Sequence, residues 1–137
     1  MKKWLLAFLA GFVATLVFHQ PMLWLLKLAG LTLRSPYIMK PVPPLGVPGV
    51  ISLAFWGGVW GIIMIAALGK AKMFYLVCTI FGAILPTLVA AFVIAPLRHV
   101  PITGNPGKLL LVGLLVNAAW GLGTAVLYRA FMGGRRN

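Results

Sequence analysis

Few side chains of this 137-residue chain could take part in chemistry. The clearest is His19, which lies in a long apolar run beside Gln20 and just before Pro21. An ionisable group at membrane depth is costly and usually marks function or pairing. His19 could act as a ligand, as a proton acceptor or as a hydrogen-bonded structural residue, and we favour the structural role.

The composition excludes mechanisms that need a carboxylate side chain. The sequence contains no Asp and no Glu, so Ser–His–Asp and Cys–His–Asp arrangements and paired-carboxylate mechanisms cannot be assembled. It also lacks the glycine loops that bind nucleotide phosphates. Its single cysteine, Cys78, cannot form an intrachain disulfide. We therefore expect no catalytic site, and predict that the protein is not an enzyme.

A redox cofactor is the next chemistry to consider. Two histidines can hold a haem iron, and His19 and His99 fall on the same predicted side of the membrane. His99, however, falls in a connector between apolar runs, whereas membrane haem proteins generally take ligands from within their spans. We therefore expect no cofactor and no metal site, and keep haem or quinone binding as the least favoured alternative.

The composition indicates a membrane protein. The chain is 62% hydrophobic and only 9% charged, with a formal net charge of +12, whereas a soluble domain is about 25% charged with both signs present. Its outer surface must therefore face lipid. The basic residues are scattered and form no stripe for nucleic acid, so we expect anionic lipids as partners instead.

Four apolar runs are long enough to cross a bilayer as helices, which needs about 20 residues each. We therefore predict an all-α, polytopic membrane protein of one domain, with spans at residues 4–26, 48–68, 73–95 and 109–132, and connectors at 27–47 and 96–108. The first run resembles a secretory signal, but no small-residue cleavage site follows it, so we expect the helix to be retained.

The basic residues near the ends of the spans predict an orientation. One side carries seven of them and the other carries five, the larger group being Lys2, Lys3, Lys70, Lys72, Arg129, Arg135 and Arg136. This bias favours both termini in the cytoplasm. Both proline-rich connectors would then face outward.

The two connectors contain similar sequences. VPPLGVPG at 42–49 and VPITGNPG at 100–107 agree at five of eight places without a gap. Pro48 and Pro106 occur where a helix begins, a position that proline favours, and Gly46 and Gly104 permit tight turning. The pattern predicts a tandem repeat of two helix–connector–helix units.

Residue depth suggests contacts between spans. Ser52 lies near the predicted level of His19, and Trp60 and Asn117 lie at nearly one depth. A Trp N–H in hydrocarbon usually finds an acceptor, which an Asn across a helix interface can supply. We therefore predict that the second and fourth spans are neighbours, with Trp60 and Asn117 within reach of each other.

Small residues predict close helix packing. Gly57 and Gly61 form a small-xxx-small pair on the second span, and Gly121 belongs to a similar stripe on the fourth. Such residues serve packing within a protomer or dimerisation. We favour packing within the protomer, because a four-helix protein needs internal seams.

The segments FHQPMLWLL and PVPPLGVPGVISLAFWGGVWG, within residues 18–62, resemble small four-span membrane proteins of bacteria. The resemblance implies a location in the bacterial inner membrane. It implies no activity and no site.

The favoured function is therefore that of a non-catalytic accessory or structural subunit, which binds a larger membrane protein, a second copy of itself or anionic lipid. The alternative is an oligomeric channel or transporter for anions or small neutral solutes. Carriers coupled to protons or cations typically use intramembrane carboxylates, and this sequence has none.

Overall fold

The fold was analysed in a computed structural model, which describes residues 1–101 and 104–133. Four of its helical segments are long and apolar enough to cross a membrane: Lys2–Leu28, Gly49–Leu68, Phe74–Leu97 and Pro106–Gly133. The prediction of an all-α protein with four spans is confirmed. The largest difference in boundary is at the fourth span, which begins at Pro106 rather than at residue 109.

Two of the spans are interrupted. The first consists of α1 (Lys2–Ala14), the π-helical turn η1 (Thr15–His19) and α2 (Gln20–Leu28). The third consists of α4 (Phe74–Val89), the π-helical turn η2 (Ala90–Ile94) and α5 (Ala95–Leu97). The second and fourth spans, α3 (Gly49–Leu68) and α6 (Pro106–Gly133), have no such turn.

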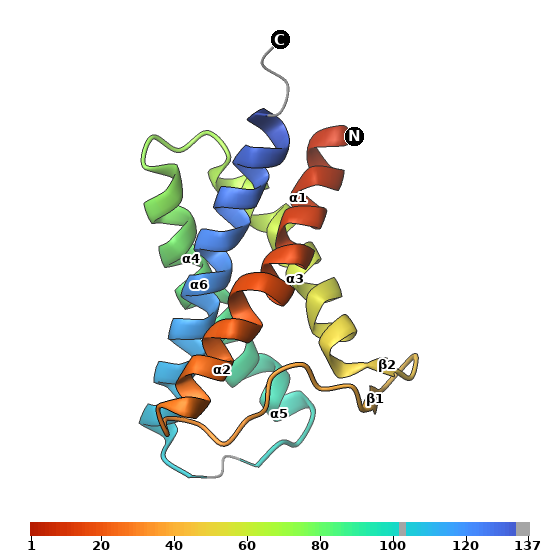
Figure 1. The fold of residues 1–137 in the computed structure, drawn as a ribbon, viewed down its shortest axis with the longest axis vertical. Helices are drawn as coiled ribbons and strands as arrows, with labels where there is room; N and C mark the ends of the chain where they lie inside the picture. Colours follow the sequence, from red (N-terminus) through yellow and green to blue (C-terminus); the bar gives the residue numbers. More distant parts are fainter. Residues whose placement is uncertain (102–103, 134–137) are drawn as a thin grey trace.

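The four spans form two helical hairpins that pack side by side. Helix α3 packs against α1, α4 packs against α6, and contacts between α1 and α6 join the two hairpins. The start of α1 and the last turns of α6 lie at one end of the bundle, here called the terminal end, and both long connectors lie at the other, the connector end (Figure 1). Arg135 and Arg136, which contributed to the predicted orientation, lie outside the described residues.

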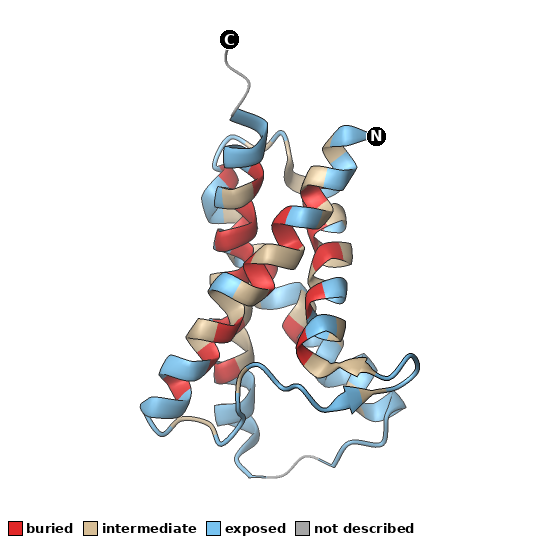
Figure 2. Cartoon of the chain, turned by 45° about the vertical axis from the view of Figure 1, so that its right-hand side comes forward, coloured by how far each residue is buried: buried red, intermediate tan, exposed pale blue. Residues whose placement is uncertain are grey.

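Glycines bring the helix backbones into direct contact. A Cβ atom at Gly11 would collide with the Gly57 carbonyl, and one at Gly61 would lie 2.6 Å from the Ala7 carbonyl oxygen. A Cβ at Gly82 would lie 2.7 Å from the Cα of Gly121. The predicted packing glycines of the second and fourth spans therefore face seams within the protomer. Figure 2 shows the buried residues on the facing sides of the helices and the exposed ones on the outside.

The first connector stabilises the start of α3. Its strands β1 (Pro41–Val42) and β2 (Val47–Pro48) form a short antiparallel hairpin that turns at Gly46, where φ is +70°. The carbonyls of Lys40 and Ile38 accept hydrogen bonds from the first two amides of α3, at 3.0 and 2.9 Å. These amides have no partner within the helix itself.

The second connector stabilises the start of α6 by a different means. Gly104 occupies the same place in the repeated sequence as Gly46 and also has a positive φ, +81°. The Asn105 side-chain oxygen then accepts hydrogen bonds from the amides of Gly107 and Lys108 at 2.8 and 3.3 Å, which caps the helix. The predicted turns at both glycines are confirmed, whereas the duplication of the whole unit stays a prediction.

The glycine seam between α4 and α6 can be tested with Gly121→Ala. The added methyl group would collide with the Cys78 carbonyl, and overpacking of this kind costs about 1–3 kcal/mol. We expect a loss of that size in the free energy of unfolding, measured by denaturant titration in detergent micelles. Gly133→Ala is the matched control, because a Cβ there meets no atom within 4 Å. Equal stability of the two variants would contradict this packing.

Candidate functional site

The π-helical turn of the first span leaves a backbone carbonyl without a helical partner. The amide of Gln20 donates to the Thr15 carbonyl instead of the Leu16 carbonyl, which would be its α-helical acceptor. The next amide position is Pro21, and proline has no N–H. Pro21 alone would leave the Val17 carbonyl without its α-helical donor, and the π turn also deprives the Leu16 carbonyl of its own.

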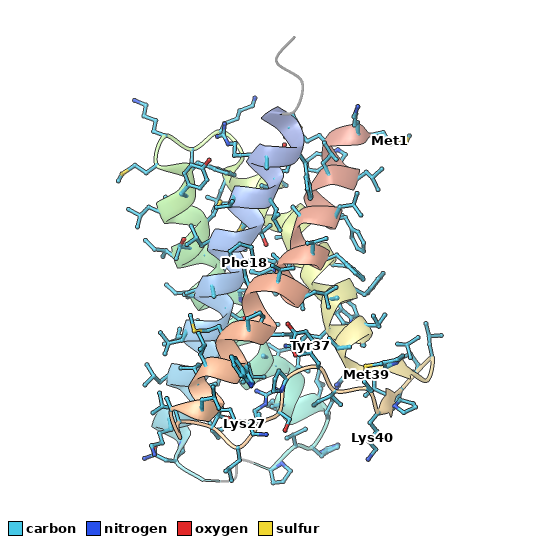
Figure 3. All side chains as sticks on the ribbon, in the orientation of Figure 1. Met1, Phe18, Lys27, Tyr37, Met39 and Lys40 are labelled. Atoms are coloured by element: carbon cyan, nitrogen blue, oxygen red, sulfur yellow. The ribbon has the colours of Figure 1, made fainter. Side chains whose placement is uncertain are left out.

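Tyr37 of the first connector supplies the missing donor. Its hydroxyl donates a hydrogen bond of 2.7 Å to the Leu16 carbonyl. In Figure 3, Tyr37 lies nearer the middle of the bundle than Lys27 and Lys40 do. The connector therefore folds back along the first span instead of extending away from it.

Tyr37 makes a second hydrogen bond to the same span. Its backbone amide donates to the side-chain oxygen of Gln20 at 2.7 Å, and the Gln20 side chain is buried. Tyr37 also has a φ of +53°, which is uncommon for a residue with a side chain. Two hydrogen bonds to one short segment of helix stabilise this conformation.

The Gln20 amide determines how His19 is protonated. Because the Gln20 oxygen accepts from Tyr37, the Gln20 nitrogen is the donor in the 2.9 Å hydrogen bond to Nδ1 of His19. Nδ1 is therefore an acceptor, and a neutral ring carries its proton on Nε2. In this state Nδ1 is not open to a metal ion or a haem iron.

The third and fourth spans extend the group of polar residues. The side-chain nitrogen of Asn117 donates to the Thr87 hydroxyl at 2.9 Å, and α6, which carries Asn117, packs against η1, which carries His19. We call His19, Gln20, Tyr37, Thr87 and Asn117 the polar cluster. It joins three spans and one connector through uncharged groups.

The polar cluster lies where the helices separate. Helix α3 packs along α1 and η1, whereas α2 packs against α6. Figures 1 and 2 accordingly show α2 and α3 diverging toward the connector end, with the first connector passing between them. The cluster therefore fixes the position of this connector.

The predicted contact between Trp60 and Asn117 is wrong. Asn117 pairs with Thr87 of the third span, and Trp60 packs edge-on against Phe81 with ring centroids 6.2 Å apart. The second and fourth spans are not principal neighbours, because α3 packs mainly on α1 and α6 mainly on α4 and α1.

The buried indole that finds an acceptor is Trp120, which the sequence analysis missed. Its Nε1 donates to the Gly11 carbonyl at 3.0 Å, and the Thr15 hydroxyl donates to the same oxygen at the same distance. Trp120 is 2% exposed. The general rule that a buried Trp N–H needs an acceptor applies to it, but sequence depth alone did not point to the first span.

The other polar candidates, Ser52 and His99, form no side-chain hydrogen bond with the polar cluster in the described part of the chain. Ser52 is half-buried, and no side-chain hydrogen bond joins it to the described residues. His99 is exposed and follows α5, with a φ of +51°. Within the described residues, His, Cys, Asp and Glu side chains form no group of three or more that could hold a metal ion.

Comparisons with models of protein families, with curated proteins and with solved structures found no match to this chain. The function has to be argued from the residues themselves. Chemically, the polar cluster can order the first connector and hold the His19 ring in one tautomer. It contains no acidic side chain with which a histidine could form a catalytic pair.

The role of Tyr37 can be tested with Tyr37→Phe. The substitution removes the hydrogen bond to the Leu16 carbonyl, and an intramolecular hydrogen bond contributes about 0.5–1.5 kcal/mol. We expect a lower free energy of unfolding in micelles and faster proteolysis of the first connector. Tyr75→Phe is the control, because no side-chain hydrogen bond of Tyr75 is described. The assignment fails if both variants behave like the parent protein.

Proposed function

We propose that the protein is a non-catalytic accessory subunit that packs against a larger membrane protein through the connector end of its third span. The observation that carries this proposal is a second π-helical turn, η2, which lacks the covering that η1 receives. We further propose that it resides in the bacterial inner membrane with both termini in the cytoplasm.

The backbone at η2 repeats the geometry of η1. The amide of Ala95 donates to the Ala90 carbonyl, and the next amide position is Pro96. By the same reasoning as at Leu16, the Ala91 carbonyl loses its helical donor. No side chain among the described residues donates a hydrogen bond to it, whereas Leu16 has Tyr37.

The surroundings of η2 are also uncovered. None of the residues of η2 and α5 is buried, and their packing partners are α4 and each other. Only 22% of the most apolar stretch of the third span is buried, compared with 33–39% in the other three spans. Phe92 is 71% exposed and Leu97 is 73% exposed.

An unpaired carbonyl in hydrocarbon costs several kcal/mol. A neighbouring protein that supplied a hydroxyl or amide donor would remove this cost and would cover the exposed apolar side chains at the same time. Lipid tails can do only the second. This difference supports a protein partner over lipid at η2.

The structure gives less support to a channel within one protomer. Several helix seams are closed by glycine contacts between backbones, which leaves little room for a pore between those helices. A channel would therefore need several copies of the chain, and the accessory role needs only one.

The proposed surface can be tested by photo-crosslinking in native membranes. With the photoreactive residue p-benzoylphenylalanine in place of Phe92, we expect a discrete crosslinked product containing one larger membrane protein. The matched control replaces Phe55, which is 50% exposed and lies near the connector end of α3. A product at neither position, or the same products at both, would contradict the proposal. A product of twice the chain's own mass would replace the larger partner by a second copy.

The proposed orientation can be tested by labelling single cysteines in a Cys78→Ala background. Leu45→Cys places a thiol in the first connector, where Leu45 is 82% exposed, and Met73→Cys places one at the terminal end, where Met73 is 62% exposed. A maleimide that cannot cross membranes should label position 45 in intact cells and position 73 only after permeabilisation. The reverse pattern would overturn the proposed orientation.

A further inference from the structure

A second unassigned feature lies at the terminal end of the bundle. A hollow of about 370 Å³ opens between the start of α4 and the last turns of α6, and its lining consists of Lys72, Met73, Phe74, Tyr75, Leu76 and Arg129. It thus combines two cationic side chains with apolar and aromatic ones. This inference does not depend on the proposed accessory role, because it concerns the opposite end of the third span.

Arg129 is held at the wall of the hollow by an aromatic ring. Its guanidinium carbon lies 4.3 Å from the centroid of the Phe74 ring, and Phe74 is 4% exposed. A guanidinium that stacks on an aromatic face keeps its N–H groups available at its edge, and these match the oxygens of a phosphate. Arg129 is therefore oriented without using its hydrogen-bond donors.

The chain offers these cations no acidic side chain as a partner. The sequence has no Asp or Glu, so neither Arg129 nor Lys72 can form an ion pair with a carboxylate side chain of the same protomer. Two neighbouring positive charges repel each other, and an anion between them would reverse that effect. The electrostatics therefore favour a ligand that brings its own negative charge.

The position of the hollow indicates the source of that anion. Lys72 lies two residues before the third span and Arg129 lies near the end of the fourth, so both occur where a span leaves the hydrocarbon. Phospholipid phosphates occupy this level, and basic residues there attract anionic lipids. Met73 and Leu76, which are 62% and 49% exposed, can contact the acyl chains of the same molecule.

We infer that the hollow between Lys72 and Arg129 binds the phosphate group of one anionic phospholipid. Arg129 would contact the phosphate oxygens directly. Lys72 would add a second charge, and the exposed ring of Tyr75 would lie at the interface between headgroup and chains, where aromatic residues are enriched.

The test measures lipid binding to the full-length protein in detergent by native mass spectrometry, with phosphatidylglycerol and phosphatidylcholine as probes. We expect phosphatidylglycerol to bind about tenfold more tightly than phosphatidylcholine. Arg129→Gln and Lys72→Gln should each weaken phosphatidylglycerol binding about fivefold, the effect of one basic residue at a membrane surface. Neither should change binding of phosphatidylcholine.

Lys70→Gln is the matched control, because Lys70 lies in the same turn but not in the lining of the hollow. It should bind phosphatidylglycerol like the parent protein. Equal weakening by Lys70→Gln and Lys72→Gln would overturn the inference in favour of general surface charge. Equal binding of the two lipids by the parent protein would overturn it as well.

The Lys72→Gln variant and a competition experiment each give an independent test of the lipid site. Because Arg129 packs on Phe74, Arg129→Gln could lower stability, whereas Lys72 is exposed and its variant should fold normally. Unchanged lipid binding by a folded Lys72→Gln therefore counts against the site regardless of the Arg129 variant. Competition by millimolar inorganic phosphate would assign the hollow to a free anion and overturn its assignment to lipid.

Discussion

A backbone in hydrocarbon has no water to complete its hydrogen bonds, and this constraint organises the connector end of the protein. In the first span the π turn and Pro21 leave the Leu16 carbonyl open, and the Tyr37 hydroxyl closes it. That bond draws the first connector back onto the bundle. The same connector then supplies the carbonyls that pair with the first amides of α3. One displaced hydrogen bond thus affects how the second span begins.

The terminal half of the bundle depends on close backbone approach instead. The absence of a side chain at Gly57 leaves room for two hydrogen bonds to the Gly11 carbonyl, one from the Trp120 indole and one from the Thr15 hydroxyl. This oxygen therefore links the first and fourth spans at a buried position. Packing and hydrogen bonding are inseparable here, since a side chain at Gly57 would collide with the Thr15 hydroxyl that makes one of the bonds.

Features that depend on local composition, such as span positions and turns, could be predicted from the sequence. Contacts between spans and the path of the first connector could not. Span positions follow from apolar runs, and the turns at Gly46 and Gly104 follow from residue type. A π turn, by contrast, adds one residue to a helical turn and rotates all later side chains by about 100° relative to an unbroken α-helix. No residue type predicts this rotation. His19 and Gln20 were identified from residue type, but their partner Tyr37 lies in a connector whose path the sequence does not fix. Asn117 was assigned the wrong partner because depth along a span does not say which spans are neighbours.

The two halves of the chain differ in how they complete the same backbone feature. Tyr37 lies in the long connector after α2, and this connector folds back to the level of Leu16. His99 has the same left-handed backbone conformation, but it continues the helical turn at the end of α5. His99 follows Ala91 by eight positions, or about 12 Å along a helix, so its backbone lies at a level well beyond that carbonyl. Within residues 1–101 and 104–133, no side chain donates a hydrogen bond to the Ala91 carbonyl as Tyr37 does to the Leu16 carbonyl. This difference between the two halves follows from connector length rather than from surface hydrophobicity.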